Sequence, residues 1–246
     1  MKYIGHRGFR KRYLENTLPG FQAVIEYGKY SPAVIGIELD IHLTVDGQIA
    51  VLHDTSLPCD GKKTNVCDLS FSEVRKIVLD RTRRPDGLVP TLDETLVLVN
   101  HQVALYLEIK DAPYNKARFA DELGRLLRAY NPRQDIVLHS FSPELVELAV
   151  GVSKKLDVEY GFLFTKLSAA KALAAPLRGA LNYFHPHYSL LVAKAEEVLD
   201  LGLPVNTWTV NSKGVLRALR RLPPDRMRSI MTDDLGLAQT EEPIDG

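Results

Sequence analysis

Short apolar runs alternate with stretches in which apolar residues recur at helical spacing along most of the chain. Short runs bounded by polar residues predict strands, and apolar residues three or four positions apart predict helices. The pattern predicts eight core strands, near Tyr3–Gly5, Val34–Asp40, Val103–Ile109, Asp135–His139, Glu159–Phe162, Ala180–Tyr183, Pro204–Thr209 and Ser229–Met231.

Helical spacing appears between these strands. Helices are expected at Leu18–Tyr30, Leu92–Asn100, Lys116–Tyr130, Pro143–Lys155, Leu190–Leu201 and Lys213–Arg221. Strands that alternate with helices favour a parallel sheet covered by helices. A barrel of eight such units usually needs about 250 residues. With 246 residues, the chain is predicted to be an α/β protein with a single (β/α)8 TIM barrel.

Two segments interrupt this rhythm after the second strand. The first is a hairpin around Thr44–Ile49, where the pair Asp46-Gly47 suits the positive φ angles of a tight turn. The second is an insertion, roughly Thr55–Pro90, rich in Lys, Arg, Pro and Asp. We therefore expect one domain, 1–246, that carries a small insertion at about 55–90.

Composition narrows the function classes. Lys+Arg and Asp+Glu both number 31, and this balance argues against a nucleic-acid partner, which usually needs a basic excess. A small anionic substrate is still allowed, because a few local cations suffice to hold a phosphate. No apolar run is long enough for a membrane-spanning helix, and the first residues lack a signal-peptide core, so a cytoplasmic protein is expected. The sequence leaves the oligomeric state open.

Two cysteines, Cys59 and Cys67, flank a polar loop inside the insertion. Two cysteines do not make a disulfide framework. Whether this pair forms a bond is left open by the sequence.

Polar residues of reactive types gather where the predicted strands end. Barrel enzymes build their active sites at the carboxyl ends of the strands. The residues at these ends are His6 and Arg7, Glu38 and Asp40, His53 and Asp54, Glu108 and Lys110, and Trp208. Their coincidence at one end of the barrel predicts a single active site.

The carboxylates among them suggest a metal site. Glu38 and Asp40 are two residues apart on one strand, so both side chains project to the same face. Together with Glu108 they would repel one another unless a cation lay between them, and hard oxygen ligands suit Mg²⁺ or Ca²⁺. The alternative is that Glu38 and Asp40 form structural ion pairs with Lys110 or Arg7.

The hairpin permits a sharper prediction. If Asp46-Gly47 is a two-residue loop, His53 lies directly opposite Asp40, with their Cβ atoms about 5 Å apart on one face. Two histidines at one mouth, His6 and His53, suit acid and base chemistry near neutral pH. For either histidine alone, a hydrogen-bonded structural role is the alternative. Arg7 offers a planar fork for phosphate oxygens.

The ordered set of motifs resembles the glycerophosphodiester phosphodiesterase family along nearly the whole chain. The longest matching stretch runs from Glu38-Leu-Asp40 through Thr44-Val-Asp-Gly47 to His53-Asp54. Shorter matches are His6-Arg7-Gly8, Glu15-Asn16-Thr17, Pro90–Leu96, Leu107-Glu-Ile-Lys110, Ser140-Phe-Ser-Pro-Glu144 and Trp208-Thr-Val-Asn211.

The resemblance implies a metal-dependent hydrolysis of glycerophosphodiesters to sn-glycerol 3-phosphate and an alcohol. It implies Glu38, Asp40 and Glu108 as ligands of at least one divalent metal ion, Mg²⁺ or Ca²⁺, with Mn²⁺ as an alternative. It implies His6 and His53 as the acid–base pair, and Arg7 and Lys110 as phosphate contacts. Glu15 resembles a site residue that orients the first loop, with a metal or substrate contact as a further role. Asn16 resembles a structural residue at the helix start, and Phe141 and Trp208 resemble pocket walls that contact the substrate.

Several alternatives stay open at this point. The same site could serve a lysophospholipase D, which an apolar rim on the insertion would favour. A non-catalytic phosphate-binding barrel is a further alternative, although such a protein would not need two proton-transfer groups. The sequence also leaves open which histidine is the base, and whether a substrate hydroxyl or water attacks phosphorus.

Overall fold

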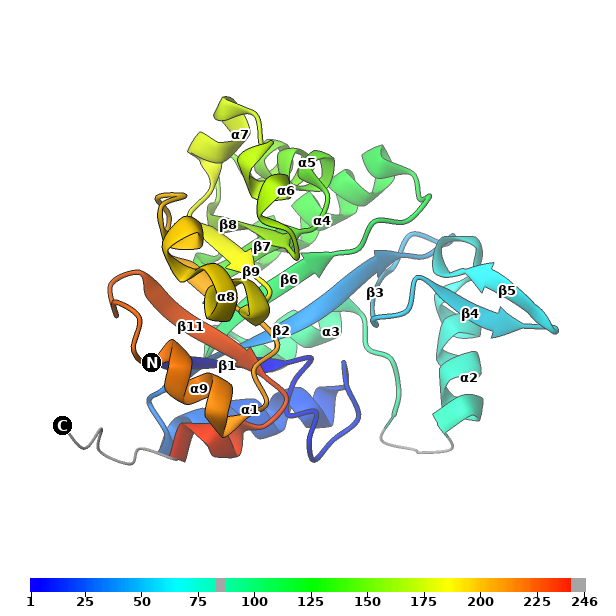
Figure 1. Ribbon diagram of the computed structural model, residues 1–246. Coiled ribbons are helices and arrows are strands. Elements are labelled where there is room, and N and C mark those ends of the chain that lie inside the picture. Colours follow the sequence, from blue (N-terminus) through cyan, green and yellow to red (C-terminus); the bar gives the residue numbers. More distant parts are fainter. Residues whose placement is uncertain (83–86, 240–246) are drawn as a thin grey trace.

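Eight parallel strands close into a barrel in the computed structural model, which describes residues 1–82 and 87–239 (Figure 1). The barrel order is β1, β2, β6, β7, β8, β9, β10 and β11, and it closes because β1 pairs with both β2 and β11. The strands are β1 (Lys2–His6), β2 (Val34–Leu43), β6 (Ala104–Ile109), β7 (Arg133–Ser140), β8 (Asp157–Phe164), β9 (Tyr183–Pro186), β10 (Val205–Thr207) and β11 (Met227–Thr232). The predicted (β/α)8 barrel is confirmed.

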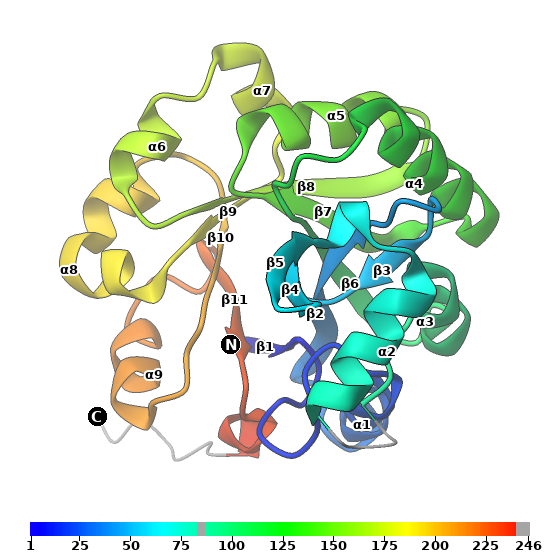
Figure 2. The ribbon, with the colours of Figure 1, turned by 90° about the vertical axis from the view of Figure 1, so that its right-hand side faces the viewer.

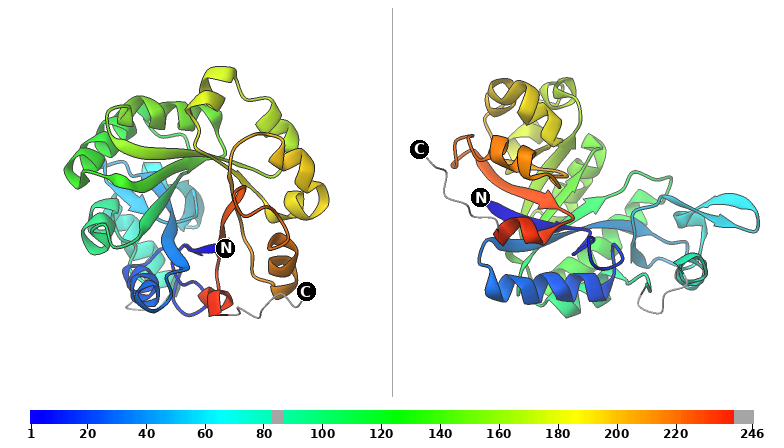
Figure 3. Two further views of the ribbon diagram at one scale, coloured as in Figure 1. Left: turned by 90° about the vertical axis from the view of Figure 1, so that its left-hand side faces the viewer. Right: turned by 60° about the horizontal axis from the view of Figure 1, so that its bottom comes forward.

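Helices surround the barrel (Figures 2 and 3). They are α1 (Leu18–Tyr30), α3 (Leu92–Val99), α4 (Lys116–Tyr130), α5 (Pro143–Ser153), α6 (Leu167–Lys171), α7 (Ala175–Ala180), α8 (Tyr188–Leu199) and α9 (Lys213–Leu219), with the 3₁₀ turn η2 (Leu235–Gln239) after β11. Caps fix several ends; Thr91 and Glu94, for example, form a reciprocal capping box at the start of α3. Between residues 1 and 239, leaving out 83–86, no helix has the length and apolarity needed to cross a membrane.

The strands bury both faces. Outward-facing residues such as Leu105 and Leu107 pack against the helices in the main core. Inward-facing residues such as Ile4, Tyr106 and Met231 fill the barrel's interior as a separate small cluster. The alternation follows from the two-residue period of a strand. The residue two positions after an inward-facing residue also faces inward. On β6, for example, Glu108 follows Tyr106 in this way and lies nearer the carboxyl end of the strand, at the barrel mouth.

The insertion projects from the carboxyl-end side of the barrel, at the right of Figure 1, and faces the viewer in Figure 2. It contains the two-stranded sheet of β4 (Ser56–Cys59) and β5 (Lys62–Asn65), then η1 (Val66–Asp68) and α2 (Phe71–Thr82). Its apolar side chains, among them Leu57, Val66 and Val74, form a core of their own. Residues 83–86 of the predicted insertion lie outside the described residues. Cys59 and Cys67 are free thiols.

One predicted strand was misplaced. Ala180–Tyr183 was expected as the sixth core strand, but Ala180 ends helix α7 and the strand β9 begins at Tyr183. The segment that forms β9, Tyr-Phe-His-Pro, is wholly buried although it includes a histidine and a proline. An apolar-run criterion therefore places the strand too early. The helices α6 and α7 were not predicted.

The predicted hairpin register is also wrong, by one residue. Strand β3 (Ile49–Val51) pairs with β2 so that Ile41 faces Val51 and Leu43 faces Ile49. The N–H of Gly47 bonds the carbonyl of Thr44 at 3.0 Å and Gly47 has a φ of 89°, which makes a three-residue loop with a glycine bulge. Asp40 therefore lies opposite Leu52, and the backbone carbonyl of Asp40 accepts the N–H of Leu52 at 3.1 Å. His53 follows Leu52, beyond the end of β3.

Candidate functional site

Three buried carboxylates meet at the barrel mouth. Glu38 and Asp40 project from β2 and Glu108 from β6, and the parallel register sets Asp40 beside Glu108. One oxygen of each lies within 4.8 Å of the others, and these three residues are 2%, 0% and 9% exposed. The strand β2 was expected to end at Asp40 but continues to Leu43. Glu38 and Asp40 therefore lie inside β2, at the level where β6 ends.

Two cations balance this acidic triad, which we define as Glu38, Asp40 and Glu108. Lys110 Nζ lies 2.6 Å from Glu108 Oε1 and 3.2 Å from Asp40 Oδ1. Arg7 Nε lies 3.3 Å from Asp40 Oδ2, and its backbone N–H donates to Glu38 Oε2 at 3.0 Å. Arg7 has a φ of 54° and Gly8 one of 88°, and this left-handed bend turns the N–H toward the triad.

The charges of the triad are unequal. Burial raises the pKa of Glu38 well above its usual range, and Asp40 and Glu108 raise it further. Burial and Asp40 also raise the pKa of Glu108, to about 7, against the opposing charge of Lys110. Burial would raise the pKa of Asp40 as well, but Lys110 and Arg7 outweigh it and lower that pKa to about 2. Asp40 is thus ionised at neutral pH, while Glu38 favours its protonated form.

These residues fit a divalent cation. All three side chains offer hard oxygen donors, the ligands that Mg²⁺ and Ca²⁺ prefer. Oδ1 of Asp40 is buried and has the ammonium group of Lys110 as its partner, at 3.2 Å. Two buried carboxylates with raised pKa values beside a third that is ionised are the features expected of a site that lacks a positive charge.

Asn16 holds Asp40 in place. Its side-chain Nδ2 donates to Asp40 Oδ2 at 2.8 Å, and its Oδ1 accepts the Asp40 backbone N–H at 3.3 Å. The sequence suggested only a structural role at the helix start for this residue. Glu15, by contrast, stays outside the triad and pairs with Arg7 at 3.2 Å and Arg10 at 2.7 Å. It therefore orients the first loop.

His6 ends β1 and lies between two acidic groups. Its Nδ1 is 2.7 Å from Asp233 Oδ1, and its Nε2 is 3.9 Å from Glu38 Oε2. Asn211 donates to the other oxygen of Asp233 at 2.6 Å. Sequence reasoning missed Asp233, although it directly follows the last barrel strand and the strand-end criterion could have found it. This carboxylate fixes a proton on Nδ1 of His6 and leaves Nε2 facing the triad.

His53 lies beside a pocket of about 450 Å³ between the first loop and the insertion. Its Nδ1 is 3.3 Å from Asp54 Oδ1, and Arg81 of α2 donates to Asp54 Oδ2 at 3.1 Å. Burial lowers the pKa of His53, while the nearby Asp40 opposes this change. Despite the shifted hairpin register, His53 and Asp40 therefore still interact electrostatically. Arg81 was not predicted as part of this arrangement.

Phe141 and Trp208 form an aromatic pair at the ends of β7 and β10. Their rings are perpendicular with centroids 5.3 Å apart, and Phe141 is 42% exposed. The indole N–H of Trp208 donates to the carbonyl of His185 at 2.8 Å, which fixes the ring. The pair is available as an apolar surface beside the mouth.

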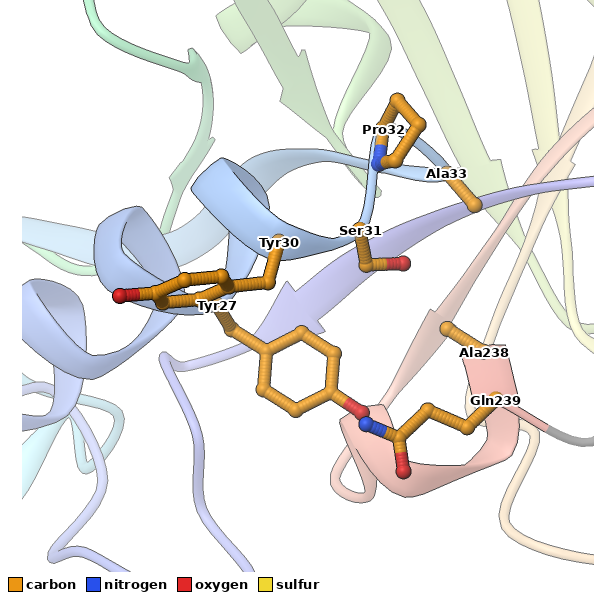
Figure 4. Close-up of a pocket in the computed structure, with 7 residues that line it drawn as sticks. All are labelled: Tyr27, Tyr30, Ser31, Pro32, Ala33, Ala238 and Gln239. Atoms are coloured by element: carbon orange, nitrogen blue, oxygen red, sulfur yellow. The ribbon is translucent and has the colours of Figure 1, made fainter.

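A larger pocket, of about 570 Å³, lies elsewhere, between the end of α1 and η2 (Figure 4). Tyr27, Tyr30 and Gln239 line it with four small residues, none of them acidic, basic or histidine. Reactive side chains thus mark the barrel mouth rather than this pocket.

Comparison with known proteins agrees with the geometry. A model of the Glycerophosphoryl diester phosphodiesterase family matches residues 6–237. The glycerophosphodiester phosphodiesterase of Caldanaerobacter subterraneus subsp. tengcongensis is 26% identical over 240 residues, covering 94% of this chain and 93% of that protein.

Solved structures show the same likeness. The glycerophosphodiester phosphodiesterase of Thermotoga maritima has a TM-score of 0.70 at 25% identity, covering 96% of this chain and 95% of that one. A phosphodiesterase from Oleispira antarctica, solved with its product sn-glycerol-3-phosphate, shares the fold with a TM-score of 0.74 at 19% identity, covering 97% and 95%. Because the family match spans the triad and both histidines, the chain belongs to the glycerophosphoryl diester phosphodiesterase family.

Proposed function

We propose that this phosphodiesterase hydrolyses glycerophosphodiesters to sn-glycerol 3-phosphate and an alcohol at the barrel mouth. The observation that carries the proposal is the convergence of a buried acidic triad, two cations and two carboxylate-bound histidines in one place. The names of the relatives support the substrate class. The structure solved with sn-glycerol-3-phosphate concerns that other protein and supports the product by analogy of fold.

Glu38, Asp40 and Glu108 would hold a divalent cation, Mg²⁺, Ca²⁺ or Mn²⁺. When bound, such a cation withdraws electron density from the phosphoryl group and offsets its negative charge. Arg7 and Lys110 lie against the same carboxylates and present their remaining N–H groups to phosphate oxygens. Their charges stabilise the extra negative charge that develops as the phosphorus becomes five-coordinate.

His6 and His53 supply the proton transfers. One accepts a proton from the attacking hydroxyl and the other protonates the departing alkoxide, contributions of about 10²–10⁴ in rate each. Asp233 holds Nδ1 of His6 and Asp54 holds Nδ1 of His53, so each histidine is oriented through one nitrogen and keeps Nε2 for the substrate. Both routes, attack by a neighbouring glycerol hydroxyl or by water, use these groups in the same way.

The alternative reactions are less well supported. A lysophospholipase D would need an apolar rim for its lipid. Within the described part of the insertion, however, only one large hydrophobic residue is exposed, Leu88 at 45%. A water-soluble diester fits this polar rim better. A non-catalytic binding barrel would have no use for two histidines that are each oriented by a carboxylate.

A substrate panel tests the proposal. Glycerophosphocholine, glycerophosphoethanolamine, glycerophosphoglycerol and lysophosphatidylcholine are assayed with Mg²⁺, Mn²⁺ or Ca²⁺. We expect release of sn-glycerol 3-phosphate with a higher kcat/KM than release of choline from lysophosphatidylcholine. The reverse order would identify a lysophospholipase D. Tight binding without turnover in any metal would identify a binding module.

Replacement of Arg81 by glutamine is expected to lower kcat about 2- to 10-fold, with little change in thermal stability. An exposed ion pair such as Arg81–Asp54 contributes at most about 1 kcal/mol to folding. It nevertheless fixes the carboxylate that orients His53. Steady-state kinetics across pH measure the effect, and a lysine at this position should restore part of it.

Arg75 provides the matched control for Arg81. It lies on the same helix but bonds Glu94 and the carbonyl of Val89. Arg75→Gln should therefore loosen the insertion without touching Asp54. Equal loss of kcat in both variants would show that Arg81 acts only by holding α2 on the barrel.

A further inference from the structure

The chain leaves the barrel sheet at His53 without the backbone bonds that hold its neighbours. Leu52 still donates to the carbonyl of Asp40 at 3.1 Å, and the carbonyl of Thr55 accepts a backbone N–H of the insertion at 3.0 Å. Between them, in the part of the chain that the structure describes, neither His53 nor Asp54 forms a backbone–backbone hydrogen bond. The position of His53 therefore depends on side chains that reach it from other elements.

His42 of β2 is the side chain that reaches the backbone of His53 from the barrel. Its Nε2 lies 3.4 Å from the carbonyl oxygen of His53. A carbonyl oxygen can only accept, so the ring proton of His42 lies on Nε2 and its Nδ1 is bare. No residue within 1–82 and 87–239 forms a hydrogen bond with that Nδ1. The hydrogen bonding of this ring is thus directed at His53.

His42 is fixed more firmly than the residue that it contacts. It is 1% exposed, whereas the side chain of His53 is 38% exposed. Burial lowers the pKa of His42 to about 4, against the opposing charge of Asp40, so the ring is neutral near pH 7 and keeps its donor. Its backbone pairs with Ala50 of β3, and it follows Asp40 by two residues on the same face of β2. The donor therefore has a fixed place relative to the Asp40 carboxylate.

A second contact holds His53 from the side of the insertion. Arg81 binds Asp54, whose other oxygen lies 3.3 Å from Nδ1 of His53. The side chains of Arg81 and Asp54 are 57% and 42% exposed, and such a pair is screened by salt and costs side-chain entropy to hold in one geometry. This pair orients the ring, while the buried His42 holds the backbone that carries it.

We propose that His42 is a positioning residue, whose Nε2–H holds the backbone of His53 at the distance from Asp40 that proton transfer requires. The bond is long and contributes little to stability, because N–H···O bonds are usually no longer than about 3.2 Å. Its effect on the reaction is larger, since a displacement of about 1 Å can lower a rate about 10²-fold. The inference rests on the proposed function, in which His53 transfers a proton.

Kinetics of the Mg²⁺-loaded protein test the proposal with two variants at this position. His42→Leu keeps a buried side chain but has no donor, and kcat should fall about 10- to 100-fold. The inhibition constant of sn-glycerol 3-phosphate and the Kd for Mg²⁺ should change little, because neither depends on where His53 lies. His42→Gln offers an amide N–H to the same carbonyl and should recover most of the lost kcat.

Three results of these assays would overturn the proposal. The first is an unchanged kcat in His42→Leu. The second is a His42→Gln protein as slow as the leucine variant, which would attribute the loss to packing. The third is much weaker binding of Mg²⁺ by His42→Leu, which would show that β2 itself has moved. If the wild-type protein turns over no glycerophosphodiester with any metal, the proposed function fails together with this inference.

Nuclear magnetic resonance of the imidazole nitrogens in the wild-type protein gives a measurement that does not depend on the folding of a variant. We expect the proton of His42 on Nε2, with slow exchange of that proton with water. A proton on Nδ1 instead would leave the carbonyl of His53 without its donor and would contradict the proposal.

Ser153 provides the matched control for His42. Its buried hydroxyl also donates to a backbone carbonyl, that of Ala149 at 2.6 Å, but within α5 on the outside of the barrel. Ser153→Ala should therefore lower Tm and leave kcat unchanged. If it lowered kcat as much as His42→Leu does, the loss would follow stability rather than the place of His53, and the proposal would be wrong.

Discussion

Replacement of His6 by alanine is expected to lower kcat/KM by about 10²–10⁴-fold with the fold intact. His6 lies 3.9 Å from a triad carboxylate, that of Glu38, and 2.7 Å from an orienting carboxylate, that of Asp233. Its loss removes one of the two proton transfers that phosphodiester hydrolysis needs. Steady-state kinetics with circular dichroism measure activity and fold together, and His53→Ala should behave in the same way.

Asp233→Asn should reduce kcat/KM less than His6→Ala does. The asparagine can still approach Nδ1 of His6, but it brings no negative charge and can present N–H instead of an acceptor. The imidazole is then no longer held with Nε2 facing Glu38. Wild-type activity in this variant would show that Asp233 does not position His6.

His101 offers a matched control for this pair. His101 lies in the loop before β6, away from the mouth. Its Nδ1 is 2.5 Å from Asp135 Oδ2, and its ring stacks on that of Tyr130, the last residue of α4. His101→Ala therefore removes a histidine–carboxylate pair of similar geometry. Lower stability with unchanged kcat is the expected result. If His101→Ala lost as much activity as His6→Ala, the loss at His6 would not report on proton transfer.

The barrel and the triad followed from the sequence because both depend on local patterns. Glu38 and Asp40 share a face through the period of two, and the strand-end criterion collected Glu108, Lys110 and His6. The hairpin register did not follow, since Thr44 and Gly47 select a three-residue loop in place of the two-residue one. A difference of one residue in loop length moves every facing partner.

Residues whose roles depend on distant partners could not be read from the sequence. Asp233 is 227 positions from His6, and Arg81 is 27 positions from Asp54. His139 and His185 look like polar residues at strand ends, yet both are buried inside the barrel because each satisfies the other. Only the closed barrel brings such pairs together, so spacing along the chain carries no signal for them.

Chelation of divalent metal is expected to abolish activity, and Mg²⁺, Mn²⁺ or Ca²⁺ should restore it. Without a cation, Glu38 and Glu108 favour protonation and the triad no longer presents its full charge. Metal at about 100 times its Kd should raise the free energy of unfolding by about 2.7 kcal/mol. Calorimetry and assays on verified metal-free protein measure both effects. Undiminished activity of the metal-free protein would rule out the metal role.

The stabilisation by metal should grow as pH rises. The pKa of Glu108 in the folded metal-free protein is about 7, above its ordinary value of 4.5, so between these values the folded state binds more protons than the unfolded state. The free energy of unfolding of the metal-free protein therefore falls as pH rises through this window. Because the metal competes with those protons, the increase in Tm that it produces should be larger at pH 8 than at pH 5.

Glu38→Gln separates the metal site from general stability. The substitution removes a buried carboxylate whose pKa is raised well above its usual range, and the amide oxygen can still accept the N–H of Arg7. The metal-free variant should therefore be more stable than the metal-free wild type at pH 8, yet lose most of the increase in Tm with Mg²⁺ or Ca²⁺. Glu159→Gln changes a carboxylate that bonds Tyr183, and this control should keep the metal response. A Glu38→Gln protein that is still fully stabilised by metal would place the cation elsewhere, because a site of three carboxylates cannot lose one without weaker binding.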